Sequence, residues 1–147
     1  MKRLALAVLV VLPLASCGGG SGDKSSSSSS ASNDPCAKPA GFKPAGSVLP
    51  SNVVPEGTLV GDLKRDGKSV SGSAFFDSSL SDAYANLKAG GANAGYQLAG
   101  DDNEGFEAEV ELVKTGGEEL SFKLKQIQGC SSATNATFSR KQESERG

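Results

Sequence analysis

Two segments in the C-terminal half of the chain alternate strictly between apolar and polar residues. In the first, glutamates separate apolar side chains at every second position: Phe106, Ala108, Val110 and Leu112 against Glu107, Glu109 and Glu111. In the second, Leu120, Phe122 and Leu124 alternate with Ser121, Lys123 and Lys125. Because successive side chains of a strand point to opposite faces, each segment predicts a strand with one buried and one solvated face. Paired antiparallel, the two strands would set glutamates opposite lysines on the solvated face.

One helix candidate can cover the apolar face of such a sheet. In residues 77–89, apolar side chains recur at the i, i+3, i+4 and i+7 positions of one stripe: Leu80, Ala83, Tyr84 and Leu87. Ser78 or Ser79 can cap the N-terminus, and Asp82 has capping-box spacing from Ser79. Gly90 and Gly91 are predicted to end the helix. We expect the stripe to bury five residues of the alternating segments: Phe106, Val110, Leu112, Phe122 and Leu124.

The remaining chain predicts further strands and an irregular lead-in. Residues 58–64 and 69–76 are strand-like and flank an Asp-Gly dipeptide, which is typical of a hairpin. Residues 94–99 predict a short strand, residues 101–105 a turn, and residues 133–139 an additional edge strand. Residues 34–55 contain five prolines and predict irregular chain, with its apolar residues laid on the domain surface. The pattern therefore predicts an α+β fold, an antiparallel sheet of about five strands with one helix packed on one face.

The N-terminus has the layout of an export signal. Lys2 and Arg3 precede an apolar run that closes on Leu14-Ala15-Ser16-Cys17. These four residues resemble the lipobox of bacterial lipoproteins, in which lipid is attached to the cysteine and the chain is cut before it. A transmembrane helix is one alternative, but Leu4 to Leu12 provides only nine apolar residues, and a span needs roughly 20. An ordinary secretory signal, with Cys17 as a passenger, is the other alternative.

These features divide the chain into five parts. They are a signal peptide (1–16), lipidated Cys17 with a flexible glycine- and serine-rich tether (17–33), the proline-rich lead-in (34–55), a small α+β domain (56–140) and a disordered tail (141–147). Without Lys2 and Arg3, 13 basic residues stand against 17 acidic ones, a net charge of −4. An acidic chain disfavours nucleic acid and anionic lipid headgroups, so membrane contact is expected through the acyl chains alone.

The remaining reactive residues limit the possible chemistry. Cys36 and Cys130 are left if Cys17 is lipidated, and an oxidising compartment predicts that they form a disulfide. A metal-binding or reactive thiol is the alternative, disfavoured because the chain has no histidine and no Cys-x-x-Cys motif. The absence of histidine also removes the commonest general base. We therefore expect no catalytic residue, cofactor or resident metal.

Two acidic segments are candidate binding sites. One contains oxygen ligands of the kind that calcium takes: Asp101, Asp102, Asn103, Glu104 and Glu107. Its spacing departs from a calcium loop of the EF-hand type, because glycine stands fifth instead of sixth and Leu112 stands at the twelfth position. A solvated turn is the simpler interpretation. The other segment is the acidic strand face of Glu107, Glu109 and Glu111, which either binds a cationic partner or only faces solvent.

The order of local motifs resembles that of a bacterial family. Leu49-Pro50, Pro55-Glu56-Gly57-Thr58, the helix with Tyr84 and Leu87, Ala94-Gly95-Tyr96 and Gly129-Cys130 follow one another along the chain. Over residues 36–138 this order resembles small uncharacterised actinobacterial lipoproteins. The resemblance implies a membrane-anchored, exported domain on the extracellular face of the cell membrane. The resemblance identifies no catalytic residues in this chain.

Two classes of function remain open at this point. The first is a non-enzymatic binding or interaction module at the cell surface, which contacts an envelope protein through the acidic face or an open sheet edge. The second is a carboxylate-dependent cell-envelope hydrolase. A cleft with two carboxyl groups of raised pKa would favour the hydrolase.

Overall fold

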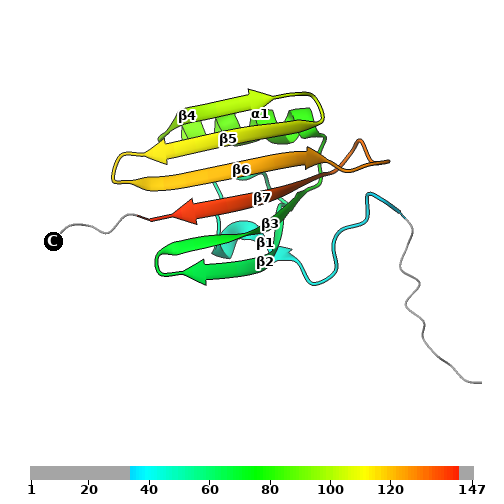
Figure 1. Cartoon of the computed structure of the whole chain (residues 1–147), viewed down its shortest axis with the longest axis horizontal. Helices are drawn as coiled ribbons and strands as arrows, with labels where there is room; N and C mark the ends of the chain where they lie inside the picture. The colour runs from blue at the N-terminus through cyan, green and yellow to red at the C-terminus, as the bar shows by residue number, and fades with distance from the viewer. Residues whose placement is uncertain (1–33, 143–147) are drawn as a thin grey trace, which may run out of the picture. The chain divides into compact units, whose positions relative to one another are not determined.

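The computed structural model describes residues 34–142, in which a helix packs on one side of an antiparallel sheet (Figure 1). The elements are β1 (Lys43–Pro44), the 3-10 helix η1 (Ala45–Ser47), β2 (Leu59–Asp66), β3 (Ser69–Phe76), α1 (Leu80–Asn93), β4 (Tyr96–Asn103), β5 (Glu107–Lys114), β6 (Glu118–Gln126) and β7 (Thr134–Lys141). The predicted signal peptide, Cys17, the tether and the tail from residue 143 lie outside the described residues.

The α+β class is confirmed, but the sheet has seven strands instead of about five, in the order β1-β2-β3-β7-β6-β5-β4. The predicted edge strand near the C-terminus, β7, in fact lies between β3 and β6. An edge strand and a central strand can share the same apolar alternation. Their difference lies in long-range pairing, which local periodicity does not encode. Placed centrally, β7 joins the β2–β3 hairpin to the β4–β5–β6 meander.

The predicted pairing of the two alternating segments is confirmed. In the β5–β6 ladder, Glu107 lies opposite Lys125 and Glu109 lies opposite Lys123. On the other face, five side chains are at most 2 % exposed: Val110, Leu112, Leu120, Phe122 and Leu124. Helix α1 packs over β4, β5 and β6 and buries Leu80 and Leu87 in the same cluster. The period of two therefore assigns the buried face of both strands correctly.

Phe106 departs from this assignment. Its side chain is 58 % exposed, although the alternating pattern predicts that it is buried. β5 begins at Glu107, so Phe106 lies in the turn after β4, where no described element covers it. The turn itself is shorter than predicted, because β4 extends to Asn103. Tyr84 is only partly buried, since its hydroxyl reaches a polar partner at the edge of the sheet.

The lead-in contributes to the core instead of lying on the surface. Four of its apolar residues are buried in the same cluster as the helix stripe: Val48, Leu49, Val53 and Val54. Arg140 of β7 donates from Nη1 to the carbonyl oxygen of Val48 at 2.8 Å and so ties the lead-in to the sheet. In Figure 1 the cyan segment passes behind β3 and β7, on the same side of the sheet as α1. The helix and the lead-in together cover one face of the sheet.

Helix α1 continues through the two glycines that were predicted to end it. Ser79 caps the N-terminus as predicted, because its side chain accepts from the backbone N–H of Asp82. A Cβ atom at Gly91 would lie 2.7 Å from the Leu112 side chain, and one at Gly90 would collide with the Val53 carbonyl. These glycines therefore let the helix approach the sheet and the lead-in closely. The helix ends after Asn93, and Gly95 takes the left-handed φ of +80° that follows it.

Candidate functional site

The face of the sheet opposite α1 is left largely uncovered, and we call it the open face. Along each strand, every second side chain points to this face. Small hydroxyl residues on three neighbouring strands form its centre: Ser71 and Ser73 of β3, Thr137 and Ser139 of β7, and Ser121 of β6. Ser71 lies opposite Ser139, which lies opposite Ser121 on its other side. Ser73, Thr137 and Lys123 form the next row in the same way. The centre of the open face is therefore polar and carries mostly short side chains.

Two hollows lie along the open face. The first has a volume of about 580 Å³, and its wall is formed by Pro39, Phe42 and Asp62 over a floor that includes Ser73, Asn135 and Thr137. Lys123, Lys125, Glu107 and Glu109 line its other side. The second, of about 590 Å³, includes Ser71, Ser121 and Ser139 from the adjacent row of the same strands. The first hollow, beside Phe42, is the candidate functional site and is called the Phe42 hollow below.

A second apolar cluster adjoins the Phe42 hollow, and Phe42 belongs to both. Phe75 belongs to the open face, yet it is only 1 % exposed, because the segment around Cys36 and the loop after β6 fold over it. Its buried neighbours are Cys130 and Ala133, and the partly buried residues packed on them are Cys36, Phe42, Leu59 and Ile127. The alternation within β3 gave no signal that this side chain is buried, because its cover comes from distant segments of the chain.

The predicted disulfide lies within this cluster. Cys36 and Cys130 are bonded, and their Cα atoms are 5.3 Å apart. The bond fixes the start of the lead-in to the loop between β6 and β7. It therefore holds the segment that carries Pro39 and Phe42 over the open face.

A β-bulge shapes the same wall of the hollow. The register of β2 against β3 shifts between Gly61 and Lys64, and Asp62 has a φ of +52°. A non-glycine residue in this region is strained, and bulges commonly re-aim side chains beside functional sites. The Phe42 ring lies directly on Gly61, where a Cβ atom would collide with it. The bulge thus re-aims Asp62, and the missing side chain of Gly61 makes room for the Phe42 ring.

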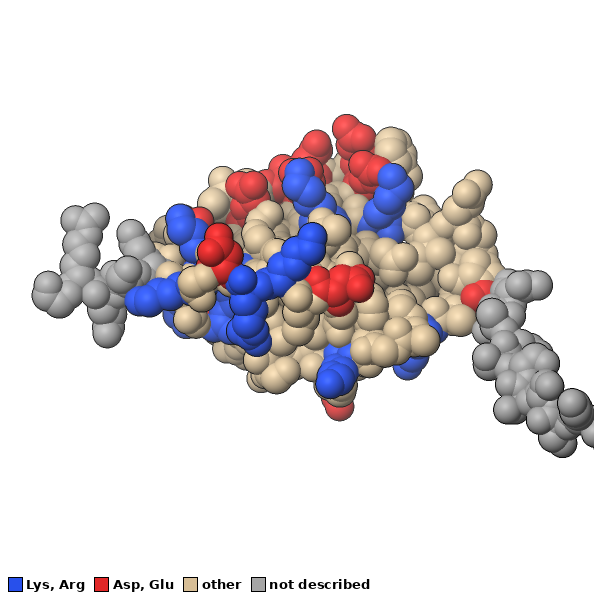
Figure 2. All heavy atoms as spheres, turned by 60° about the horizontal axis from the view of Figure 1, so that its bottom comes forward, with Lys and Arg blue, Asp and Glu red and all other residues tan. Residues whose placement is uncertain are grey.

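The acidic strand face is largely neutralised by its neighbours. Lys123 Nζ lies 2.8 Å from Glu109 Oε1, and Lys125 Nζ lies 2.5 Å from Glu107 Oε1. The hydrogen bond that Lys123 donates to Glu109 raises the pKa of Lys123. Glu111 lies opposite Ser121 and forms no ion pair within residues 34–142. In Figure 2 acidic side chains gather at the top of the molecule and basic side chains lie directly beside them, so this face is zwitterionic instead of uniformly acidic.

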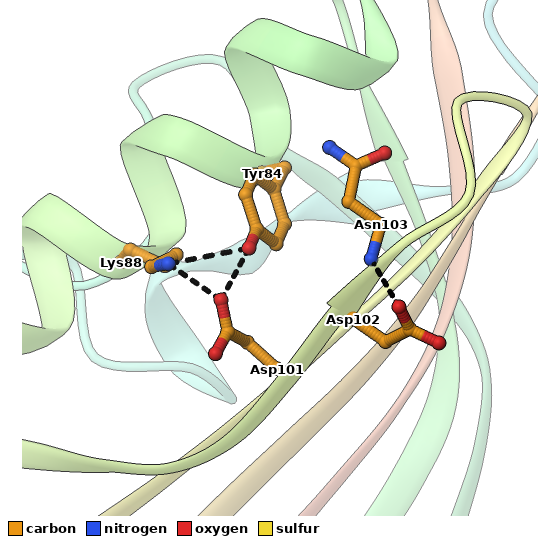
Figure 3. Close-up of polar contacts among 5 residues, drawn as sticks. All are labelled: Tyr84, Lys88, Asp101, Asp102 and Asn103. Atoms are coloured by element: carbon orange, nitrogen blue, oxygen red, sulfur yellow. Dashed lines mark hydrogen bonds and ion pairs between the residues drawn. The ribbon is translucent and has the colours of Figure 1, made fainter.

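A polar cluster at the edge of the sheet joins α1 to β4 (Figure 3). Tyr84 donates its hydroxyl proton to Asp101 Oδ2, and Lys88 Nζ lies 2.5 Å from the same oxygen and 3.2 Å from the tyrosine oxygen. The hydrogen bond from Lys88 lowers the pKa of Asp101, and the same bond raises the pKa of Lys88. These shifts keep both groups charged at neutral pH, so neither is suited to proton transfer there. The cluster is best explained as a tether for the edge strand.

The geometry of β4 separates Asp101 from the other residues of the calcium hypothesis. Asp101 points toward the helix, whereas Asp102 turns away from it and accepts from the Asn103 backbone N–H (Figure 3). Asn103 Oδ1 accepts instead from the N–H of Gly105. No group of three or more cysteine, aspartate or glutamate side chains in residues 34–142 is placed to hold a metal ion. Asp102, Glu104 and Glu107 nevertheless line one small pocket of about 100 Å³, and cation binding at this turn stays a prediction.

A second polar cluster closes one end of the buried core. Arg140 Nε lies 2.7 Å from Glu118 Oε1, and both side chains are less than a quarter exposed. Burial raises the pKa of Glu118, but hydrogen bonds from Tyr96 and Arg140 outweigh it and leave this pKa below its ordinary value. Burial and the bond to Glu118 raise the pKa of Tyr96. Because Arg140 also binds the Val48 carbonyl, the cluster secures the lead-in to the core.

We expect Glu118→Gln to lower the free energy of unfolding by about 1–3 kcal/mol at neutral pH, because the Arg140 charge loses its partner. The depressed folded pKa means that the stabilisation is complete above the ordinary value of 4.5 and is lost as pH falls through the folded pKa. In urea unfolding at several pH values, the free energy of unfolding of Glu118→Gln should therefore fall less steeply with decreasing pH than that of the wild type. Glu56→Gln, at an exposed glutamate, is the matched control. The same pH dependence of the free energy of unfolding in the wild type and in Glu118→Gln would contradict a stabilising role for the Glu118 carboxylate.

Both edges of the sheet carry features that oppose strand addition. β1 has only two residues and includes Pro44, and the rest of β2 is bulged and charged. β4, at the other edge, has a register shift between Leu98 and Gly100, followed by Asp101 and Asp102. Bulges and charges at an edge discourage pairing with an extended segment. The open face is therefore a better candidate for binding than either edge.

Comparisons with protein-family models, with curated proteins and with solved structures found no match for this chain. Within residues 34–142, no helix has the length and hydrophobicity that a membrane span requires. The function of this chain is therefore inferred from its sequence motifs and from the geometry of the open face.

Proposed function

We propose that this chain is an exported bacterial lipoprotein, anchored to the extracellular face of the cell membrane through lipid on Cys17, and that its folded domain is a non-enzymatic binding module. The Leu14–Cys17 motif supports the anchor, and the serine-rich segment after it is suited to a tether. Two or more acyl chains on one residue hold a protein firmly, at roughly 0.8 kcal/mol per buried CH₂ group.

The proposed binding role is supported by one observation: the open face is polar and hollowed. A sheet of this size needs one covered face to form a core, and the helix and lead-in provide that cover. On the other face the disulfide-linked lead-in and the bulge in β2 raise walls around a hollow of about 580 Å³. A preformed hollow with several polar groups and an aromatic wall is the usual form of a small-ligand site.

The hydrolase alternative finds no support in the described carboxyl groups. An acid catalyst of this kind needs a raised pKa. In residues 34–142, the shifted carboxyl groups are Asp101 and Glu118, and hydrogen bonds lower the pKa of each. Neither group lines the Phe42 hollow. We therefore retain binding as the proposed function.

The structure changes which surface is proposed to contact an envelope partner. A basic protein would be attracted by a free row of glutamates, but Glu107 and Glu109 are already paired with lysines. An extended segment would need an open edge, and both edges carry bulges. The proposed contact with an envelope component is therefore assigned to the open face, by shape and hydrogen bonding more than by net charge.

We expect Cys17→Ser to move the protein from the membrane fraction to the medium, or to leave it uncleaved. Serine cannot form the thioether through which the lipid is attached. Fractionation of a bacterial host that processes lipoproteins, followed by detergent phase partitioning and mass measurement, checks this result. A Cys17→Ser variant that is still cleaved and still partitions with the membrane would contradict the lipid anchor.

We expect Ser139→Arg to abolish crosslinking of the anchored chain to its envelope partner in intact cells. Ser139 is exposed on the central strand, so a long charged side chain there blocks the open face without entering the core. Asn86→Arg places the same side chain at an exposed position of α1, behind the sheet, and should leave the crosslinks unchanged. Equal crosslinking by both variants would remove the open face from the proposal.

A further inference from the structure

We propose that the Phe42 hollow binds a segment of a neutral sugar chain. The inference rests on the proposed binding function and names the ligand class for the same site. Three independent features of the hollow lead to it: the pairing of its lysines with glutamates, the hydrogen-bonding character of its floor, and its fixed aromatic wall.

Of the five charged side chains that line the hollow among the described residues, four are paired with one another before any ligand arrives, and the fifth is Asp62. Each of the two lysines that line it is paired with a glutamate that also lines it, at 2.8 Å and 2.5 Å. An anionic ligand would have to displace a glutamate from one of these two lysines. A ligand without net charge avoids that displacement and can accept from the lysine ammonium groups and donate to the carboxylates that remain in place.

The floor of the hollow offers groups that both donate and accept. Ser73 and Thr137 lie opposite each other on neighbouring strands, and Asn135 lies one repeat before Thr137 on β7. Hydroxyl and amide side chains each supply a donor and an acceptor. Sugar hydroxyls have the same dual character, so one sugar ring can satisfy several of these groups together. A fatty acyl chain would leave all of them unpaired, at a considerable cost in free energy.

The wall supplies an apolar surface that is already ordered. The Phe42 ring lies on Gly61, and the disulfide six residues before it holds its segment in place. An aromatic ring packs well against the C–H face of a sugar ring, which is apolar although the rim of the ring is polar. Because Phe42 is fixed before binding, little conformational entropy remains to be lost on complex formation. Asp62, re-aimed by the bulge, adds a carboxylate to the same wall.

The second hollow indicates a ligand longer than one sugar. It continues along β3, β6 and β7, and its floor at Ser71, Ser121 and Ser139 belongs to the row adjacent to that of the Phe42 hollow. Successive residues on one face of a strand are roughly 6.6 Å apart. A chain of sugars that enters at Phe42 can therefore extend along the open face toward Ser139.

The test is a titration of the full chain, purified in a detergent without a sugar headgroup, with four neutral hexasaccharides: maltohexaose, mannohexaose, xylohexaose and chitohexaose. Two-dimensional ¹⁵N–¹H NMR reports both affinity and position. At least one of the four is expected to bind with a Kd of about 1 mM or tighter. The shifted amides should include those of Ser73, Asn135 and Thr137. No shift with any of the four hexasaccharides at about ten times that concentration would overturn the proposal.

Two variants locate the site and separate it from general stability. Phe42→Ala should weaken binding at least about tenfold, whereas Phe106→Ala removes another exposed phenylalanine, outside the hollow, and should bind as wild type does. Thr137→Val keeps the shape of an exposed residue, removes one hydroxyl and should weaken binding about threefold or more. Wild-type affinity in both Phe42→Ala and Thr137→Val would overturn the assignment to this hollow.

The outcomes also distinguish this inference from the proposed function. If no hexasaccharide binds but Ser139→Arg still abolishes crosslinking, the sugar assignment is wrong and the binding module stands. If affinity falls steeply with added salt, the ligand is recognised through charge and the neutral assignment is wrong. If hexasaccharides do not bind and Ser139→Arg crosslinks as wild type does, both proposals are wrong.

Discussion

Replacing Phe122 by alanine is expected to lower the free energy of unfolding by about 3–5 kcal/mol. Phe122 lies near the middle of β6, its side chain is 0 % exposed, and its ring centroid is 6.5 Å from that of Phe138 on β7. Truncation removes a large apolar surface from the core. It also leaves a cavity that a rigid sheet cannot close by small shifts. Urea unfolding followed by circular dichroism measures the change directly.

Glu109→Ala is the matched control for this prediction, because Glu109 lies on β5 directly beside β6 but points to the other face. Its ion pair with Lys123 is solvent-exposed, and such pairs contribute roughly 0–1 kcal/mol. The free energy of unfolding should change by about 0.5 kcal/mol or less. Equal effects from Phe122→Ala and Glu109→Ala would refute the assignment of the two faces of the sheet.

The double substitution of Cys36 and Cys130 by serine is expected to lower the free energy of unfolding by about 2–5 kcal/mol. The two residues are 94 positions apart, so the bond restricts most of the unfolded domain. Its loss also frees the segment that covers Phe75, a phenylalanine with only 1 % exposure. Destabilisation should therefore be accompanied by exposure of the second apolar cluster, which binding of a hydrophobic dye detects.

Peptide mapping without reduction provides the necessary control, since it should recover Cys36 and Cys130 in one linked fragment. Ser132→Ala tests whether the effect belongs to the bond itself, because the Ser132 hydroxyl lies 3.4 Å from the Cys36 sulfur and 3.7 Å from that of Cys130. This variant should keep the disulfide and nearly all of the stability. Two free thiols in protein purified from the cell envelope would end the disulfide assignment.

Periodicity and capping motifs predicted the local structure of this chain well. The alternation in residues 106–125 was sufficient to place β5 beside β6 and to set Glu107 and Glu109 opposite lysines. The Ser79–Asp82 capping pair located the start of α1. These features depend on residues close together in sequence, or on a single hairpin, and so the sequence carries them directly.

Features that depend on distant contacts were not predictable in the same way. Gly90 and Gly91 look like a helix end, and only the presence of Val53 and Leu112 shows that they are points of close approach. Phe75 alternates with serines like a solvated residue, and only the disulfide-linked lead-in buries it. In both cases the contacting residue lies far away in the sequence, and no local pattern predicts the contact.

The candidate site follows the same division. The sequence by itself determined the α+β class, the cysteine pair and the polar character of the strand faces, because composition and a period of two specify them. Only the tertiary structure decided that β7 lies at the centre of the sheet and that Phe42 and Asp62 rise beside Ser73 and Thr137. The physical reason is that a hollow on a sheet is assembled from strand order, a bulge and a crosslink, and each of these is a relation between segments far apart in the sequence.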